Sequence, residues 1–395
     1  MHRIVYLDNV ATTKVHPQVL EEMLPYFSEY YANPSSIYKV GRDARKVVED
    51  AREDIARYLN AQPKEVVFTS CATESNNLAI KGVAYAQRQK GNHIITSTIE
   101  HSSVIKVCKE LEREGFEVTY IPVDEFGIVD AGAVRGAIKK ATVLISIMFA
   151  NNEVGSVQPI AEIGKIARAN NVIFYTDAVQ AIGKIKIDVN ALNIDMLSLS
   201  GHKIYAPKGI GALYIRKGTS VKPMLVGGEQ EFSKRAGTEN VAGIVGLYKA
   251  IELAHRGMNE NVFRMNQLKR RLMERISSNI EGSHINGSPT QCLPNILNVS
   301  FENVEGEAII LSLDSVGVYV STGSACASGS VEPSHILLAM GLDARAVRSS
   351  IRFSIGIYNT EEDVDYTADK LIEVISRLRS ISPFSVSEAI GGVKK

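Results

Sequence analysis

Residues 195–213 of the chain read DMLSLSGHKIYAPKGIGAL. The apolar run that ends at Ser200 is typical of a buried strand, and Lys203 follows it after Gly201 and His202. A stretch rich in glycine and proline comes next, which indicates a turn. Lysine is almost never fully buried unless it is paired. The position of Lys203 therefore suggests that its amine has a chemical role.

Strand-like segments alternate with helical patterns from about residue 15 to about residue 250. The strand-like segments are nearly continuous apolar runs, as expected when helices cover both faces of a sheet. They cover residues 65–70, 93–98, 117–123, 141–150, 171–177, 196–200 and 211–216. Helical patterns include residues 19–31, 44–60 and 74–89. This alternation predicts an α/β fold with a mostly parallel sheet.

The pattern changes after about residue 255. A charged helical pattern over residues 259–280 precedes strand-like segments at 295–301, 318–323 and 352–356, with helical patterns at 305–317 and 360–381. This order predicts a smaller α+β domain. We expect a large domain over residues 15–255, a small domain formed by residues 1–14 and 256–380, and a flexible tail over residues 381–395.

The composition is that of an ordinary globular protein. Charged residues make up 22% of the chain, and 44 Lys and Arg balance 44 Asp and Glu. A net charge of zero gives no support for nucleic acid or an anionic membrane as a partner. No apolar run approaches the roughly 20 residues of a membrane span, and the first residues resemble a strand rather than a signal peptide. We expect a cytoplasmic protein.

The four cysteines are spread along the chain, at Cys71, Cys108, Cys292 and Cys326. None lies in a CxxC motif, and no Cys/His cluster has zinc spacing. Disulfides are rare in the cytoplasm, so each cysteine is by default a small buried residue or an idle thiol. Only the context of Cys326 changes that interpretation.

Polar side chains follow five of the predicted strands. They are Thr73 after residues 65–70, His101 after 93–98, Asn152 after 141–150, Asp177 at the end of 171–177 and Lys203 after 196–200. Ligands of open α/β sheets bind beyond the carboxyl ends of the strands. We therefore expect these five side chains to share one site.

Pyridoxal 5′-phosphate (PLP) would use these groups together. A helix N-terminus at Thr73 suits a phosphate, and His101 can stack on the ring. Asp177 can keep the pyridine nitrogen protonated, while Lys203 can condense with the aldehyde. Each residue also has a simpler explanation, as a surface lysine, a helix cap or a satisfied core histidine. Their joint order along the chain favours PLP.

Longer segments resemble the signature blocks of the cysteine desulfurases, which are class-V, fold-type-I PLP enzymes. They run from residue 6 to about residue 356 and read YLDNVATT, NPSS, ATESNNLAIKG, EHSSV, NNEVG, DAVQAIGK, SLSGHKIYAPKGIGALY, RAGTEN, STGSACAS and SIRFSIG. The block STGSACAS resembles the NifS/IscS group. The resemblance implies a large domain with a mostly parallel seven-stranded sheet and a smaller α+β domain.

The resemblance also implies a role for each matching position. Lys203 would bind the PLP aldehyde, Asp177 the ring nitrogen and Gln180 the phenolic oxygen. His101 would stack on the ring and move protons. Asn152 would contact the cofactor and, with Arg352, bind the substrate carboxylate. The phosphate would be held by Ala72, Thr73, Ser200 and His202, and by Thr238 from the second subunit of a homodimer.

Cys326 would be the nucleophile of the implied reaction. The enzyme would take sulfur from L-cysteine, release L-alanine and leave a persulfide on Cys326. That sulfur would pass to an acceptor, an iron–sulfur scaffold protein or a tRNA-thiolation protein. Cys326 would need to be a thiolate, and a free cysteine has a pKa of about 8.5. The resemblance also allows Cys326 to be a transient iron–sulfur ligand.

Two other functions remain open from the sequence. One is a selenocysteine lyase or another PLP lyase on the same fold, and the other is a non-catalytic assembly partner. Several positions carry residues that are unusual for the family, while the predicted catalytic residues Lys203, Cys326 and His101 are all present. These positions are Val10, Ala32, Tyr38, Cys71, Ala206 and Ile357.

Overall fold

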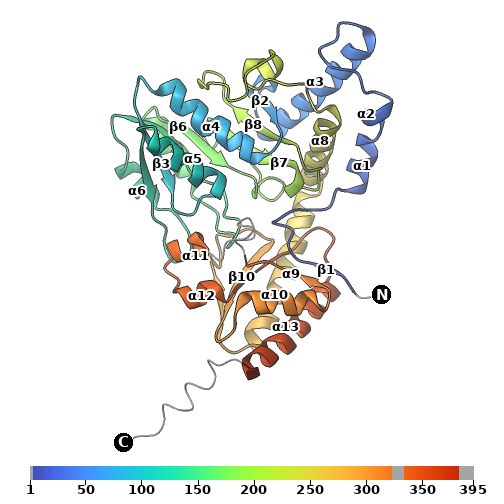
Figure 1. The fold of residues 1–395 in the computed structure, drawn as a ribbon, viewed down its shortest axis with the longest axis vertical. Coiled ribbons are helices and arrows are strands. Elements are labelled where there is room, and N and C mark those ends of the chain that lie inside the picture. Colours follow the sequence, from blue (N-terminus) through green and yellow to red (C-terminus); the bar gives the residue numbers. More distant parts are fainter. Residues whose placement is uncertain (1–2, 323–332, 382–395) are drawn as a thin grey trace, which may run out of the picture.

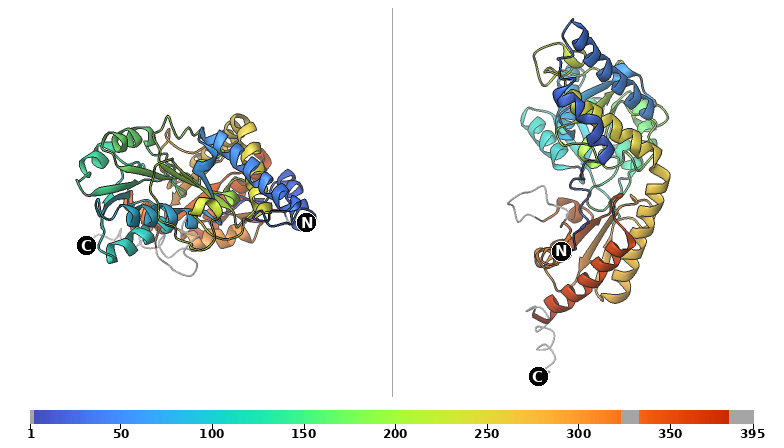
Figure 2. Two further views of the ribbon diagram at one scale, coloured as in Figure 1. Left: turned by 90° about the horizontal axis from the view of Figure 1, so that it is seen from above. Right: turned by 90° about the vertical axis from the view of Figure 1, so that its right-hand side faces the viewer.

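The computed structural model describes residues 3–322 and 333–381. The chain forms an elongated molecule, with the larger sheet in the upper part and the smaller sheets below it (Figure 1). Helix α9 (Met258–Asn279) runs along one side and connects the two parts (Figure 2). No helix in this described part of the chain is long and apolar enough to cross a membrane.

The large sheet has seven strands in the order β2-β8-β7-β6-β5-β3-β4. Only β8 runs opposite to the other six strands, so the prediction of a mostly parallel seven-stranded sheet is confirmed. The strands are β2 (Val66–Thr69), β3 (His93–Ser97), β4 (Glu117–Ile121), β5 (Thr142–Ser146), β6 (Ile173–Asp177), β7 (Met196–Ser200) and β8 (Gly211–Ile215).

Helices cover both faces of this sheet, as the view from above shows (Figure 2). Side chains alternate between the two faces: Ile145 and Phe174 belong to one core cluster, and Leu144 and Tyr175 to the other. The first face packs against α3 (Lys39–Leu59), α6 (Ala131–Gly136), α7 (Ile160–Ala169) and α8 (Val241–Arg256). The second face packs against α4 (Ala72–Gln87) and α5 (Ser102–Arg113).

The predicted helix over residues 19–31 is broken in the structure. Helix α1 (Pro17–Met23) ends before Pro25, and a short helix α2 (Pro25–Ser28) follows. Proline has no backbone N–H and its ring disfavours a helical conformation at the preceding residue, so one continuous helix is not formed.

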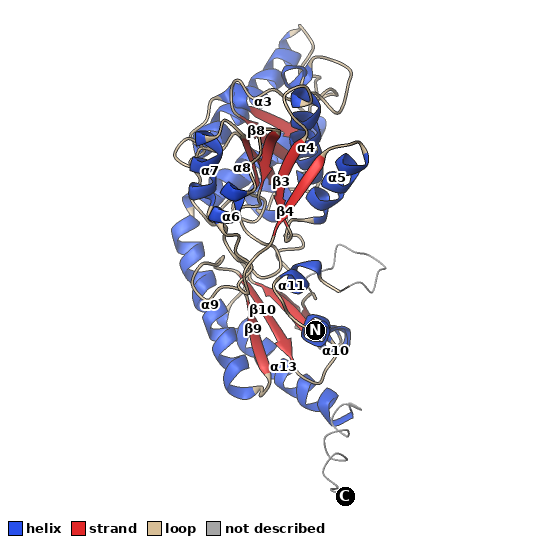
Figure 3. Cartoon of the chain, turned by 90° about the vertical axis from the view of Figure 1, so that its left-hand side faces the viewer, coloured by secondary structure: helices blue, strands red, loops and turns tan. Residues whose placement is uncertain are grey.

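The lower part contains a three-stranded antiparallel sheet in the order β12-β10-β9 (Figure 3). Its strands are β9 (Ser283–Asn286), β10 (Ile296–Phe301) and β12 (Ser350–Ser354). A separate parallel pair joins β1 (Val5–Tyr6) to β11 (Val318–Tyr319). The helices of this part are α9, α10 (Gly306–Asp314), α11 (His335–Ala339), α12 (Ala344–Arg348) and α13 (Glu361–Ile381).

Two details of the lower part differ from the sequence interpretation. Strand β9 was not predicted, because it is short and only half-buried and therefore has no apolar run. Of the described residues 318–322 in the predicted strand at 318–323, Val318 and Tyr319 form β11, which pairs with the N-terminal strand β1. The division into domains at residues 14/15 and 255/256 stays a prediction.

A buried ion pair holds the turn η3 (Gln230–Ser233) against helix α3. Arg52 is 1% exposed and donates to both carboxylate oxygens of Glu231, at 2.7 and 2.9 Å. Its guanidinium also lies over the rings of Phe68 and Phe232. Glu231, Phe232 and Ser233 all have positive φ, which is costly for residues other than glycine. The ion pair therefore helps to hold a strained turn in place.

Replacing Arg52 by Met should lower the free energy of unfolding by about 3–5 kcal/mol, because Glu231 would stay buried without its partner. Urea denaturation of the full-length protein measures this change. The matched control is Arg57→Met on the same helix, whose pair with Asp54 lies in solvent and contributes less than about 1 kcal/mol. Equal losses in the two variants would contradict this role for Arg52.

Candidate active site

The carboxyl ends of five strands of the large sheet point to the same edge. Strands β3, β5, β6 and β7 are connected by parallel pairings, and β2 runs in the same direction because both β2 and β7 are antiparallel to β8. The polar residues that follow these strands are therefore brought to one side of the molecule, as the sequence predicts. Each is fixed there by neighbours from other elements.

Lys203 ends a short 3₁₀ turn, η2 (Gly201–Lys203), that directly follows β7. Its ammonium donates to the backbone carbonyls of Val10, at 2.6 Å, and Ala11, at 2.7 Å. The hydroxyl of Thr13 donates to the carbonyl of His202 at 3.1 Å. The N-terminal segment thus binds the turn that carries the lysine.

Asp177 is buried at the end of β6, and each carboxylate oxygen has a defined donor. The side-chain amide of Asn76, on α4, donates to one oxygen at 2.9 Å. The backbone N–H of Val179 donates to the other at 3.0 Å. The same amide of Asn76 donates to Ser103 on α5, so the two helices of this face fix the carboxylate together. A carboxylate held in this way can be aimed at one ligand atom.

His101 caps the N-terminus of α5, and its Nδ1 lies 2.7 Å from the hydroxyl of Ser103. Burial lowers the pKa of His101; the charge of Asp177 opposes this, and the charges of Lys203 and His335 reinforce it. A lowered pKa keeps the ring neutral at pH 7. These interactions also show that His101 lies within electrostatic reach of both Asp177 and Lys203.

A phosphate would fit at the N-terminus of α4. Ala72 and Thr73 form its first turn, where backbone N–H groups have no partner within the helix. Ser200, at the end of β7, has a buried hydroxyl without a hydrogen-bond partner in the described part of the chain. A Cβ on Gly211 would come within 3.2 Å of the Cα of Cys71, so glycine permits the close approach of β8 to this turn.

Arg352 and Asn152 meet at the boundary between the two parts of the molecule. Arg352 is buried on β12 and donates to the backbone carbonyl of Asn152 at 3.1 Å and to a carboxylate oxygen of Asp8 at 2.7 Å. The side-chain oxygen of Asn152 is buried and has no partner among the described residues. The structure thus brings together the two residues that the sequence paired, and it adds Asp8.

The other predicted site residues occupy different surroundings. Gln180 is buried and donates to the carbonyl of Val10 at 3.4 Å. Thr238 is exposed between η3 and α8, where it lines a small cavity together with Ser70 and Gly209. Cys326 lies outside the described residues, so its predicted roles as nucleophile and transient iron–sulfur ligand stay predictions.

Asn76, Ser103 and Asp8 were missed by the sequence reasoning. Asn76 and Ser103 stand inside the quoted blocks ATESNNLAIKG and EHSSV, so the signal was present. Their function depends on hydrogen bonds between elements far apart along the chain, which the sequence pattern does not give.

The buried carboxylate at Asp177, the lysine after β7, the unpartnered hydroxyl of Ser200 and the helix N-terminus at Ala72 together fit PLP. The fold and this site define a PLP-dependent enzyme.

Comparison with known proteins identifies the family. Residues 5–367 match the aminotransferase class-V family model. The chain is 52% identical to "Cysteine desulfurase IscS" of Methanosarcina thermophila over 98% of this chain and 96% of that protein. It is 51% identical to the protein of the same name from Dictyoglomus turgidum, over 97% of this chain and 98% of that protein. The chain therefore belongs to the aminotransferase class-V family, and within it to the IscS/NifS-like cysteine desulfurases.

Solved structures agree with this assignment. A "NifS-like protein" superposes with a TM-score of 0.90 at 41% identity, covering 96% of this chain and all of that chain. A structure titled "SspA in complex with cysteine" superposes with a TM-score of 0.81 at 40% identity, covering 90% of this chain and all of that chain. The predicted PLP-transferase fold is confirmed.

The pKa of His202 predicts a pH dependence of stability. Burial, reinforced by the charges of Lys203 and Lys208, lowers this pKa from 6.5 to about 4. The unfolded chain takes up the proton below pH 6.5 and the folded chain only near pH 4, so the unfolded chain binds more protons in between. The stability of the PLP-free protein should therefore fall as pH drops through this window.

Replacing His202 by Gln should flatten that part of the stability curve, as measured by urea denaturation of the PLP-free protein at several pH values. The control is His284→Gln, since the His284 side chain is 61% exposed in the lower part of the molecule. An unchanged slope in the His202 variant would show that this histidine is not the titrating group.

Proposed function

We propose that this protein is an active cysteine desulfurase that takes sulfur from free L-cysteine, releases L-alanine and delivers the sulfur through Cys326. The observation that carries the proposal is the grouping of Lys203, Asp177 and His101 at one edge of the sheet, with Arg352 and Asn152 beside it. Membership of the IscS/NifS-like group supports the choice of substrate.

Several of the predicted site residues would hold and tune the cofactor. Lys203 would bind its aldehyde, Asp177 would keep its ring nitrogen protonated, and Ser200 would donate its hydroxyl to the phosphate. Bound PLP supplies an electron sink that weakens the bonds at the α-carbon and the C–S bond of cysteine. His101, neutral at pH 7, can accept or return a proton beside Lys203.

The substrate carboxylate would be recognised at the boundary between the two parts. Arg352 offers a guanidinium that can grip a carboxylate with two N–H groups. In the structure these groups contact Asp8 and the carbonyl of Asn152. A bound substrate would therefore compete with Asp8 for the guanidinium, so Asp8 would help to decide how tightly the amino acid is held.

Cys326 would receive the sulfur. Its thiolate would attack the sulfur of cysteine, the C–S bond would break, and the products would be alanine and a persulfide on Cys326. The electron pair of the C–S bond would stay with the carbon, which takes up a proton to complete the methyl group of alanine and so balances the proton that Cys326 released. The hydrogen of the substrate thiol would stay on the outer sulfur of the persulfide. The persulfide would then pass to an acceptor, for which an iron–sulfur scaffold protein or a tRNA-thiolation protein is proposed.

A homodimer is the proposed working form. Large apolar side chains are exposed on and after α1 and α2, with Phe27 64%, Tyr31 77% and Ile37 88% exposed. Exposed apolar groups so close together favour burial against another chain. Thr238 is also exposed, as a residue offered to the second subunit should be. The cytoplasm is the proposed location, because the separated cysteines suit a reducing compartment.

Replacing Cys326 by Ala should leave PLP binding intact and lower alanine formation by about a thousandfold or more, as removal of a nucleophile does in other enzymes. The assay mixes protein, PLP, L-cysteine and a thiol reductant and measures alanine and sulfide. The control is Cys292→Ala, which should keep the normal rate. Alanine production by the Cys326 variant at the normal rate would remove Cys326 from this role.

A further inference from the structure

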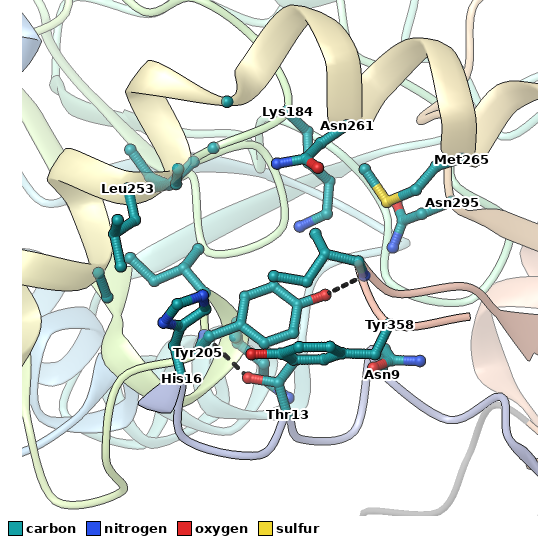
Figure 4. A pocket seen from close by; sticks show the side chains of 18 of the residues that line it. Asn9, Thr13, His16, Lys184, Tyr205, Leu253, Asn261, Met265, Asn295 and Tyr358 are labelled. Atoms are coloured by element: carbon teal, nitrogen blue, oxygen red, sulfur yellow. Dashed lines mark hydrogen bonds between the residues drawn. The ribbon is translucent and has the colours of Figure 1, made fainter. Parts of the chain in front are cut away.

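The two residues expected to bind the aldehyde and the ring nitrogen of PLP have different surroundings. Lys203 lies on the wall of a cavity of about 540 Å³ between the N-terminal segment and the junction of α8 and α9 (Figure 4). Asp177 does not line this cavity and is 6% exposed. Its carboxylate lies among buried polar side chains of α4 and β6, where hydrogen bonds to water are lost. The protein must therefore satisfy these groups itself.

Asn76 is the central residue of this buried group. It is fully buried on α4, and its amide nitrogen donates to Asp177 at 2.9 Å and to Ser103 at 2.8 Å. An ionised carboxylate can only accept hydrogen bonds. The amide nitrogen must therefore face Asp177, because the reverse orientation would place the amide oxygen against the carboxylate.

Tyr175 fixes that orientation from the other side of the amide. Its hydroxyl donates to the amide oxygen of Asn76 and lies 2.9 Å from the hydroxyl of Ser198 on β7. Tyr175 stands two residues before Asp177 on β6, so the two side chains point to the same face of the sheet. Burial raises the pKa of Tyr175 well above its usual range, so the hydroxyl keeps its proton and stays a donor. The hydrogen bonds thus run in one direction, from Tyr175 through Asn76 to Asp177.

Helix α4 connects this amide to the expected phosphate site. The helix begins at Ala72 and Thr73, where the PLP phosphate is expected, and Asn76 lies one turn further along. One rigid element therefore carries both the expected phosphate site and the amide that holds Asp177. A change at Asn76 should be felt at the cofactor although the residue is fully buried.

We propose that Asn76 and Tyr175 are positioning residues for the ring nitrogen of PLP. The Tyr175 hydroxyl sets the orientation of the Asn76 amide, and the amide holds the Asp177 carboxylate where it can accept from the protonated ring nitrogen. Both residues act through Asp177 and need no contact with the cofactor. The inference rests on the role of Asp177 in the proposed function.

The test measures the dissociation constant of PLP and the absorption spectrum of the bound cofactor, on full-length protein that is freed of PLP and then titrated with it. Tyr175→Phe and Asn76→Leu should each weaken PLP binding by at least about tenfold, as loss of a buried hydrogen bond predicts. Both should change the spectrum in the same direction as Asp177→Asn, because all three disturb the contact with the ring nitrogen. The control Tyr214→Phe removes another buried hydroxyl of the same sheet, one without a hydrogen-bond partner among the described residues, and should change neither property.

A double variant shows whether Tyr175 acts through the amide. If it does, adding Tyr175→Phe to Asn76→Leu should not weaken PLP binding further, whereas independent effects would multiply. Multiplied losses would overturn the proposal, and so would single variants that bind PLP with the normal affinity and spectrum. Tyr175→Phe removes one oxygen atom only, so it keeps the test decisive if Asn76→Leu does not fold.

The Asp177→Asn variant separates this inference from the proposed function. A changed spectrum in Asp177→Asn, together with normal spectra in the Tyr175 and Asn76 variants, would overturn the inference alone. A normal spectrum in Asp177→Asn would overturn the proposed role of Asp177 and this inference with it. Because the read-outs are PLP affinity and absorption, the result does not depend on the desulfurase activity.

Discussion

The hydrogen bonds from the Lys203 ammonium to the carbonyls of Val10 and Ala11 connect the large sheet to the N-terminal segment, and the rest of the site depends on this connection. Strand β1 of the same N-terminal segment pairs with β11, and Asp8 of this segment accepts a hydrogen bond from Arg352. A short piece of chain therefore joins the lysine of the large sheet to the arginine of the small sheet. The site exists only where both sheets and this segment come together.

Burial decides the charge state of the groups around that junction. It keeps His101 and His202 neutral at pH 7, which leaves His101 able to accept a proton. It also lowers the pKa of Lys184, the nearby lysine that carries no predicted catalytic role. Asp177 is held instead by direct donors, from Asn76 and the backbone of Val179. Hydrogen bonds thus hold the carboxylate of Asp177 in place, while loss of solvation lowers the pKa values of the two histidines and of Lys184.

Much of this arrangement could be predicted from the sequence. Parallel strands place their carboxyl ends on one edge, so the polar residues after each apolar run had to converge. Asn76 and Ser103 were missed because their role depends on contacts between helices and a strand that are distant in sequence. Strand β9 was missed because a half-exposed four-residue strand has no clear period, and the break at Pro25 was overlooked within an otherwise helical pattern.

The most direct test of the central claim is to locate the lysine that binds PLP. The protein would be mixed with PLP, reduced with borohydride and digested, and the labelled peptide identified by mass spectrometry. We expect the label on Lys203 alone. A label on Lys184 or Lys208 instead, or no label on any lysine, would contradict the site described above.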